Sequence, residues 1–333
     1  MMGCSNSRSS IEMISLKITW QPKQEYTAAK KLLGVHMKWE GNRESDNVED
    51  RRGDSGGEGG SGLGGLLGGR SIGIGTIVIA LVGGWAFGIN PLTILNVLSG
   101  GAPPSQVQQQ QRPAQRPPAD DHMGKFVSTV LADTEDVWTQ VFAQNGSAYK
   151  EPRLVLFRGA TATACGQGQA AMGPFYCPGD QKVYIDLGFY ETLTKRLGAP
   201  GDFAQAYVIA HEVGHHVQNL MGISSKMDQM RGRVSKVEYN ALSVRLELQA
   251  DCFAGLWAHN AQNTRQILEQ GDVEEAMNAA AKIGDDALQS ASGSAVVPES
   301  FTHGTSAQRQ RWFDTGLKTG SVKACDTFSA KNL

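Results

Sequence analysis

The segment His211 to His215, which reads HEVGH, combines residue types and a spacing that could perform chemistry. On a helix, residues four apart share a face, so His211 and His215 can present two imidazoles to one metal ion. Glu212 lies one step around the helix, where its carboxylate can reach a water on that metal. Zinc makes such a water nucleophilic near neutral pH, and Glu212 would accept its proton. We therefore predict a Zn²⁺ site with Glu212 as general base.

A second segment, Glu247-Leu-Gln-Ala-Asp251, can complete this site. Catalytic zinc takes three protein ligands and keeps a fourth position open for water. We predict Glu247 as the third ligand. Asp251, one helical turn later on the same face, would accept the second ring N–H of a histidine ligand. Two carboxylates on an otherwise apolar helix need buried partners, which a metal site supplies; the alternative is an exposed acidic edge.

The sequence leaves the role of His303 open. It lies in a loop before a helix, in the segment SFTHGTS. From there it can stabilise the oxyanion of the transition state, or it can serve as an alternative third ligand. Tyr184 and Tyr239 are further candidates for oxyanion donors. His216 points away from the face shared by His211 and His215, and we predict a structural or supporting role for it.

Hydrophobic periodicity and capping residues predict the elements that position these side chains. Capping boxes open helices at Asp202, Ser235 and Asp272, and a further helical stretch starts at Ser306. The predicted helices cover 126–142, 202–221, 235–261 and 272–289, and the predicted strands cover 154–157 and 182–187. We expect Val183–Asp186 to be an edge strand that binds extended peptide by adding it to the sheet.

Composition divides the chain into five segments. Residues 1–36 form an extension without a clear pattern, and Met37 is an alternative natural start. Residues 37–70 are charged and then glycine-rich, which predicts disorder, and 99–122 form a Gln/Pro-rich linker. Residues 71–98 carry no charge, and the stretch 72–89 is 18 residues long, about the minimum for a transmembrane helix. Residues 123–333 form the globular domain.

Charge and cysteine content restrict the possible partners and the location. The net charge of −2 gives no sign of nucleic-acid binding. Cys165 and Cys177, and Cys252 and Cys325, are possible disulfide pairs, and four free buried thiols are the alternative. The uncharged segment 71–98 predicts a single-pass protein of the inner membrane. Disulfides and a slight excess of arginine before residue 71 predict its orientation. Its N-terminus would lie inside, with the globular domain on the extracytoplasmic, periplasmic side.

Four motifs resemble the bacterial putative neutral zinc metallopeptidase family. They are HEVGHHVQ (211–218), LELQADCFAGLWAH (246–259), PESFTHGTSAQRQRWF (298–313) and GPFYCPGD (173–180). The segment 37–53 also resembles the family, which supports Met37 as the natural start. The resemblance covers Met37 to Phe328 and implies a membrane span and a zincin-like domain. The second motif is similar to that of thermolysin-like gluzincins, which implies Glu247 as ligand and Asp251 as its support.

We therefore expect an α+β, zincin-like domain, mostly helical with a small sheet and preceded by one transmembrane helix. The predicted function is that of a membrane-anchored zinc peptidase acting on peptide or protein substrates. The alternative is a non-enzymatic, membrane-tethered binding module with a structural zinc, closed by four protein ligands. An interaction protein without any metal is a third reading, in which the site residues would be coincidental.

Overall fold

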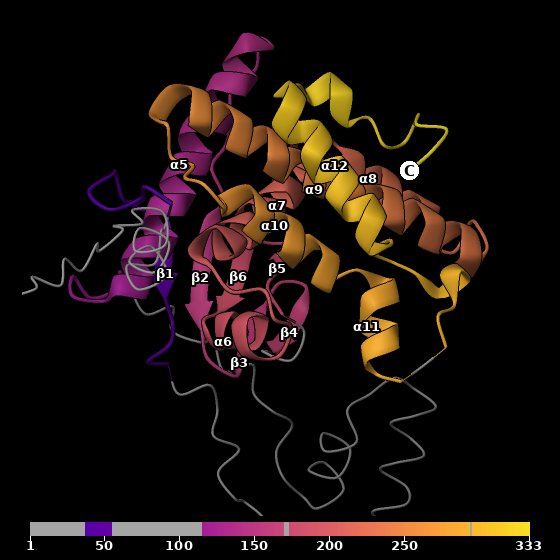
Figure 1. Ribbon diagram of the computed structural model, residues 1–333, viewed down its shortest axis with the longest axis horizontal. Coiled ribbons are helices and arrows are strands. Elements are labelled where there is room, and N and C mark those ends of the chain that lie inside the picture. The colour runs from indigo at the N-terminus through magenta and orange to yellow at the C-terminus, as the bar shows by residue number, and fades with distance from the viewer. Residues whose placement is uncertain (1–36, 55–114, 170–172, 294) are drawn as a thin grey trace, which may run out of the picture. The chain divides into compact units, whose positions relative to one another are not determined.

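The computed structural model of the protein describes residues 37–54, 115–169, 173–293 and 295–333 (Figure 1). Over these ranges the chain is mostly helical with two small sheets, which confirms the predicted α+β class. The helices are α5 (His122–Gln144), α6 (Gly188–Lys195), α7 (Asp202–Leu220), α8 (Ile223–Met230), α9 (Lys236–Arg265), α10 (Asp272–Lys282), α11 (Asp285–Ala291) and α12 (Ser306–Thr319), with 3₁₀ turns η2 (Pro298–Ser300) and η3 (Val322–Cys325).

The main sheet has the strand order β1-β2-β6-β5. β1 (Val48–Asp50) and β6 (Lys182–Asp186) pair in parallel with β2 (Arg153–Phe157), and β5 (Phe175–Cys177) pairs antiparallel with β6. A separate hairpin joins β3 (Ala160–Thr163) and β4 (Gly166–Gln169). Because β6 has neighbours on both sides, our prediction that Val183–Asp186 is an edge strand is wrong. The edge strand that packs against α7 is β5.

Residues 37–54 differ from the predicted disorder of 37–70, because they pack on the domain. The side chains of Met37, Trp39 and Val48 are buried, and the Trp39 ring contacts Phe126 edge-on. The buried carboxylate of Glu135 accepts hydrogen bonds from Arg43, Ser45 and Asn47. These anchors, together with β1, make the segment part of the sheet and core. Residues 1–36 and 55–114 lie outside the described residues.

The predicted location, a single pass through the inner membrane, needs correction. A single crossing by residues 71–98 would separate residues 37–54 from the domain, yet β1 pairs with β2. The backbone N–H of Asp50 also donates to the carbonyl of Gln115 at 2.7 Å, so the two flanks of 55–114 meet. Residues 71–98 themselves lie outside the described ranges, and within those ranges no helix is long and apolar enough to cross a membrane. The longest helices, α5 and α9, carry several charged side chains.

Helices form over most of the predicted ranges, but two of the three predicted capping boxes are wrong. The capping box of Ser235 and Glu238 opens α9 as predicted. Asp202 and Asp272 are instead the first residues of α7 and α10, whose N-caps are Gly201 and Gly271. Gly201 has a φ of 119°, and the backbone there lies close to Glu275 of α10. A side chain at residue 201 would occupy the place of the Glu275 carboxylate, which caps the N–H of Phe203 at 3.2 Å. The helix predicted over 272–289 is divided into α10 and α11 near Gly284.

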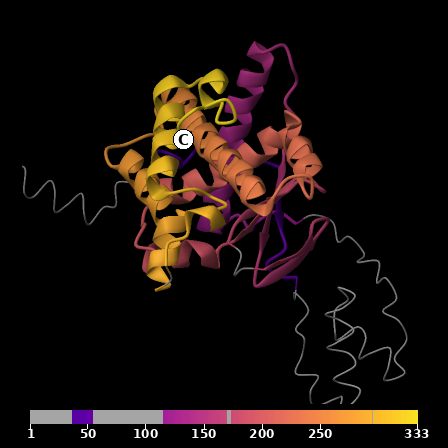
Figure 2. The same ribbon diagram turned by 90° about the vertical axis from the view of Figure 1, so that its right-hand side faces the viewer.

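Helix α7 lies at the centre of the helical layer. It packs on α5, α9 and α10 and contacts strands β5 and β6, and the later helices lie to one side of the sheet (Figure 2). Gly214 brings it close to Ala250 of α9, where an added Cβ would lie 3.1 Å from the carbonyl oxygen. A tighter contact joins α9 and α12, because a Cβ at Gly255 or Gly316 would overlap the backbone of the other helix. Gly255 thus permits close packing of α9 on α12.

Both predicted disulfide pairs are present. The Cys165–Cys177 bond joins the turn of the β3–β4 hairpin to the end of β5. The Cys252–Cys325 bond joins α9 to the C-terminal segment. Cys177, Cys252 and Cys325 are fully buried. Disulfides persist mainly outside the cytoplasm. The second bond links residues 73 positions apart and holds the C-terminal segment against the helix that carries Glu247.

Candidate metal centre

Helices α7 and α9 bring three predicted ligands together. One ligand atom each from His211, His215 and Glu247 lie within 4.8 Å of one another. The Nε2 atoms of His211 and His215 lie 3.2 and 3.5 Å from the same Glu247 oxygen, Oε2. In this arrangement both imidazoles aim the same ring nitrogen at one point between the two helices.

The other ring nitrogen of His211 is held by a buried carboxylate. Its Nδ1 lies 2.8 Å from Oδ1 of Asp251, which is completely buried. Arg309 of α12 donates to both oxygens of Asp251 at 2.9 Å, and the Tyr207 hydroxyl donates to Oδ1 at 2.5 Å. With a metal bound, Nδ1 of His211 would therefore keep its proton, and Nε2 would give up its own and offer its lone pair to the metal. Asp251 occupies the place that the sequence predicted for it.

The imidazole of His215 is oriented by an uncharged side chain, which we call its neutral support. Its Nδ1 donates to Oε1 of Gln218 at 2.8 Å. The Gln218 amide donates to the carbonyl of Leu246 and to the side chain of Gln249, whose own amide donates to the carbonyl of Cys325. This row of amides ends at the residue that the disulfide bond fixes to α9. It orients the second imidazole without adding charge beside the metal ligands.

The donor set fits a zinc ion. Two imidazole nitrogens and one carboxylate oxygen are a common protein ligand set for catalytic zinc. With bonds of 2.0–2.1 Å, two ligands of a tetrahedral zinc lie about 3.3 Å apart. The two measured nitrogen–oxygen separations, 3.2 and 3.5 Å, lie close to this value. His211, His215 and Glu247 are thus the described residues best suited to hold the ion.

The charged groups of the site shift one another's pKa values. Burial lowers the pKa of His211, but Asp251 and Glu247 outweigh burial and raise it to about 10. Burial raises the pKa of Glu247, while the facing His215 and His211 hold it well below its usual range. Burial likewise raises the pKa of Asp251, but Arg309 and His211 lower it to about 2. The site therefore keeps both carboxylates charged and poised to balance a cation.

Glu212 lies beside this group but is not one of its ligands. Only 7% of the residue is exposed, and it interacts electrostatically with both histidines and with Glu247. Burial raises the pKa of its carboxyl, and Glu247 raises it further against the opposing effect of the histidines. A carboxyl with a raised pKa is a better proton acceptor, which suits a general base. The buried Tyr190 hydroxyl of α6 has no hydrogen-bond partner among the described residues, and the charge of Glu212 helps to raise its pKa.

His303 is not part of the three-residue group. Its Nδ1 lies 3.2 Å from Oδ1 of Asp285, and half of its side chain is exposed. The Asp285 carboxylate also accepts the backbone N–H groups of Thr302, His303 and Gly304, which fixes the loop. The proximity of Asp285 raises the pKa of His303, and the charge of Glu247 contributes in the same direction. His303 thus lies within electrostatic reach of the site with Nε2 left available.

The remaining predicted side chains have structural contacts. His216, fully buried, pairs with the Tyr176 hydroxyl at 3.0 Å and with the carbonyl of Lys150 at 2.6 Å, and burial lowers its pKa to about 4. Its predicted structural role is consistent with these bonds. The Tyr184 hydroxyl donates to Asp180, and the Tyr239 ring faces Arg231. Neither tyrosine lies among the contacts of the three ligands.

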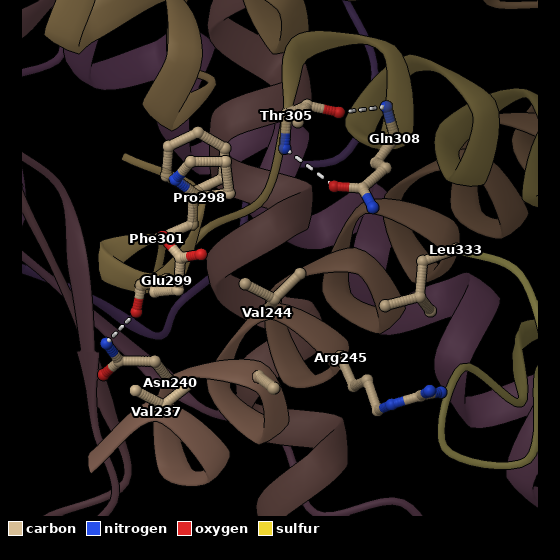
Figure 3. A pocket seen from close by; sticks show the side chains of 11 residues that line it. Val237, Asn240, Val244, Arg245, Pro298, Glu299, Phe301, Thr305, Gln308 and Leu333 are labelled. Carbon is tan, nitrogen blue, oxygen red and sulfur yellow. Dashed lines mark hydrogen bonds between the residues drawn. The ribbon is translucent and has the colours of Figure 1, made fainter. Parts of the chain in front are cut away.

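A groove of about 400 Å³ opens along the first half of α9, and Figure 3 shows the side chains that line it. It runs between the first half of α9, the segment from η2 to the start of α12, and Leu333. Asn240 closes one end by donating to the carbonyl of Glu299 at 2.9 Å. None of the predicted site residues lines the groove. However, Val244 lies one helical turn before Glu247, and Thr305 lies two residues after His303, so the groove adjoins the site.

Sequence reasoning missed Arg309, Tyr207 and Gln218. Arg309 is 2% exposed and shares the buried face of α12 with Trp312, Phe313 and Gly316. An arginine at an apolar position of a helix was the available signal, because a buried guanidinium needs an acidic partner. Tyr207 and Gln218 lie four residues before His211 and three after His215, on the same helix face. That spacing marked them as neighbours of the ligands.

Fold and site together have the features of a metallopeptidase: an α+β domain with an HExxH sequence on α7 and a facing carboxylate on α9. Residues 37–328 match the family described as "Putative neutral zinc metallopeptidase", and the chain belongs to that family. It is 52% identical over 292 residues to the uncharacterized protein YpfJ of Escherichia coli (strain K12), covering 88% of this chain and 99% of YpfJ.

A more distant relative is the uncharacterized protein Rv2575 of Mycobacterium tuberculosis (strain H37Rv). It is 40% identical over 220 residues, which cover 63% of this chain and 73% of Rv2575. No solved structure matches the chain. The family description implies zinc, in agreement with the donor set formed by His211, His215 and Glu247.

Proposed function

We propose that the protein is a zinc-dependent peptidase in which His211, His215 and Glu247 hold the metal and Glu212 is the general base. The observation that carries this proposal is the spacing of the three donor atoms, 3.2 and 3.5 Å, beside a buried glutamate. Zinc in such a site acidifies water and polarises the peptide carbonyl. The family description supports the same class of reaction.

The chain's own residues would divide the remaining tasks. Glu212 accepts the proton of the attacking water and passes it to the leaving amine, which its raised pKa favours. Asp251 and Gln218 fix the ring orientations of His211 and His215. His303, oriented by Asp285, donates from Nε2 to the oxyanion that develops on the substrate carbonyl.

We assign the substrate backbone to the free edge of β5. Strand addition needs an unpaired edge beside the catalytic helix, and β5 pairs on one side only and packs against α7. A peptide bound there would protect the amides of Phe175–Cys177 from hydrogen exchange. Unchanged exchange at these amides in the presence of a bound peptide inhibitor would remove β5 from the proposal.

The competing function is a binding module with a structural zinc. Such a site needs a fourth protein donor, and His303 is the candidate that the sequence offers. Its Nδ1 is engaged by Asp285, and the group of donors within 4.8 Å in the described ranges consists of three residues. Three protein donors leave one position for water, which favours catalysis.

The test uses the purified full chain and its Glu212→Gln variant. Bound zinc is measured by mass spectrometry of the metal, and cleavage of a mixed peptide library by mass spectrometry of the fragments. We expect about one zinc in both proteins and a loss of about 10²- to 10⁴-fold in cleavage rate for the variant. Glu191→Gln, an exposed glutamate on α6, is the matched control and should cleave normally. Zinc without cleavage in the wild type would favour the binding module.

A further inference from the structure

Strand β5 turns one of its three side chains toward the helix that carries the proposed histidine ligands. Successive side chains of a strand point to opposite faces of a sheet. Phe175 and Cys177 lie in a small apolar cluster on one face. Tyr176 packs instead on the main core, and its hydroxyl bonds to two side chains of α7, His216 and Asn219. Tyr176 is therefore the residue of β5 whose side chain can fix the strand to this helix.

The hydrogen bonds of the Tyr176 hydroxyl have defined directions. Nε2 of His216 lies 2.6 Å from the carbonyl oxygen of Lys150, which can only accept, so Nε2 carries a proton. Burial keeps the rest of this ring unprotonated, because it lowers the pKa of His216 to about 4. Nδ1 then accepts the O–H of Tyr176 at 3.0 Å, and the Tyr176 oxygen accepts the Asn219 amide at 3.1 Å. The hydroxyl thus directs both its donor and its acceptor at α7.

These bonds reach α7 directly beside the candidate metal centre. His216 follows His215 in the chain, and the two imidazoles point to different neighbours. His215 aims Nε2 at Glu247 of α9, whereas His216 bonds to Tyr176 of β5. One peptide bond thus separates the residue that meets β5 from a residue proposed to meet the metal. The distance between the free edge of β5 and the candidate metal centre therefore depends on the Tyr176–His216 bond.

A second tyrosine contacts the same histidine without such a bond. The rings of Tyr149 and Tyr176 both meet the His216 ring edge-on, with centroids 5.9 and 5.4 Å away. The Tyr149 hydroxyl is buried, and it has no hydrogen-bond partner in the part of the chain that the structure describes. The two tyrosines therefore allow the effect of the hydroxyl bond to be separated from that of ring packing.

We propose that Tyr176 is a positioning residue of the peptidase reaction, whose bond to His216 sets the distance between a substrate on the edge of β5 and the candidate metal centre. The inference rests on the proposed function, because it takes β5 as the strand that binds the substrate backbone. Backbone pairing fixes a peptide against β5, but it does not fix β5 against α7. A displacement of about 1 Å at a reacting group can lower the rate about 10²-fold, so this second connection matters for catalysis.

The kinetic test compares the full chain with its Tyr176→Phe and Tyr149→Phe variants. Each variant loses one hydroxyl and keeps an aromatic ring beside His216. We expect both to bind as much zinc as the wild type. With a peptide that the wild type cleaves, Tyr176→Phe should lower kcat about tenfold or more and change KM less than about twofold, because the free edge of β5 remains. Tyr149→Phe should retain the wild-type kcat and KM. A Tyr176→Phe variant that is less stable but has the wild-type kcat would overturn the proposal.

A second measurement locates β5 without any catalysis. Cobalt(II) replaces zinc at the candidate centre, and the pseudocontact shifts of the β5 amides report their position relative to the metal. Tyr176→Phe should change the shifts of Phe175–Cys177, whereas Tyr149→Phe should not. Asn219→Ala removes the donor to the Tyr176 oxygen but keeps the bond to His216, so its change should be smaller. Equal shifts in the wild type and Tyr176→Phe would overturn the proposal.

The activity of the wild type distinguishes failure of this inference from failure of the proposed function. If the wild type and Tyr176→Phe cleave at equal rates, the inference is overturned and the proposed function stands. If the wild type binds no metal or cleaves no peptide, the proposed function is overturned and the inference with it. Support requires a cleaving wild type, a lower kcat in Tyr176→Phe and a shifted β5 in the same variant.

Discussion

Helix α7 carries two groups of converging side chains that have the same spacing but different chemistry. Near its middle, two imidazoles meet the carboxylate of Glu247 from α9; at its start, Asp202 meets two carboxylates from α10. Each group gathers its ligand atoms within 4.8 Å. The histidines are oriented by side-chain partners on their far nitrogens, and the acidic group is held by backbone N–H donors. Donor type and support, rather than closeness alone, distinguish a candidate transition-metal site from a group of carboxylates.

The largest expected effect separates the two groups by their affinity for zinc. His215→Ala removes one of three ligands, so we expect loss of bound zinc and of all zinc-dependent cleavage. Asp272→Asn removes a carboxylate from the other group and should leave the zinc content at the wild-type value. Metal analysis after dialysis against a weak chelator measures both. Zinc loss in Asp272→Asn would break the distinction between the groups.

A smaller effect is expected from the charged support of His211. Asp251→Asn keeps the size of the side chain but removes the charge that Arg309 and His211 share. We expect a 10- to 100-fold weaker affinity for zinc, as for other residues that orient a metal ligand. Competition with a fluorescent zinc chelator measures this affinity. Asp228→Asn on the exposed side of α8 is the control, and an equal loss there would contradict the assignment.

The neutral support of His215 should matter less than the charged one. Gln218→Leu removes the acceptor for Nδ1 of His215 but leaves no buried charge without a partner. We therefore expect a loss of zinc affinity of less than about tenfold. The same chelator competition compares the two variants directly. A larger loss of zinc affinity in Gln218→Leu than in Asp251→Asn would contradict the prediction that the charged partner of His211 contributes more than the neutral partner of His215.

The smallest effect concerns the acidic group and pH. Burial and the neighbouring Asp202 and Asp272 raise the pKa of Glu275 to about 7 in the folded protein, whereas its usual value is 4.5. The unfolded state therefore binds fewer protons between pH 4.5 and 7, and the free energy of unfolding decreases as pH rises through this window. Urea unfolding should show that Glu275→Gln reduces this decrease. A slope equal to that of Glu274→Gln, an exposed glutamate in the same helical turn, would contradict the raised pKa.

Local spacing was enough to predict which residues converge in the candidate metal centre. His211, Glu212 and His215 share one helical segment, and Glu247 and Asp251 share another, so their relative positions follow from helix geometry alone. The strands at 154–157 and 182–187 and most helix boundaries also follow from local pattern. The structure brings His211, His215 and Glu247 together, and their role as zinc ligands stays a prediction.

Contacts between distant segments were beyond this reasoning. Arg309 lies 58 residues from Asp251, and nothing in its local sequence names that partner. The strand order made β6 central and β5 the edge, although β6 has the more regular alternation. The charged segment 37–54 looked disordered because its partners, among them Glu135 and Leu154, come from residues about 90 to 110 positions away.

The candidate metal centre depends on the crossing of α9 and α12, which lies away from the proposed ligands. A substitution at this crossing would disturb the centre. Gly255 and Gly316 let the two backbones touch, and the same crossing sets the height at which Arg309 meets Asp251. A single methyl group at either glycine would push α12 outward and withdraw the guanidinium from its carboxylate. Screens for inactive variants should therefore recover alanine at these positions as often as changes beside the ligands. Relatives that lack either glycine are therefore expected to lack the proposed peptidase activity as well.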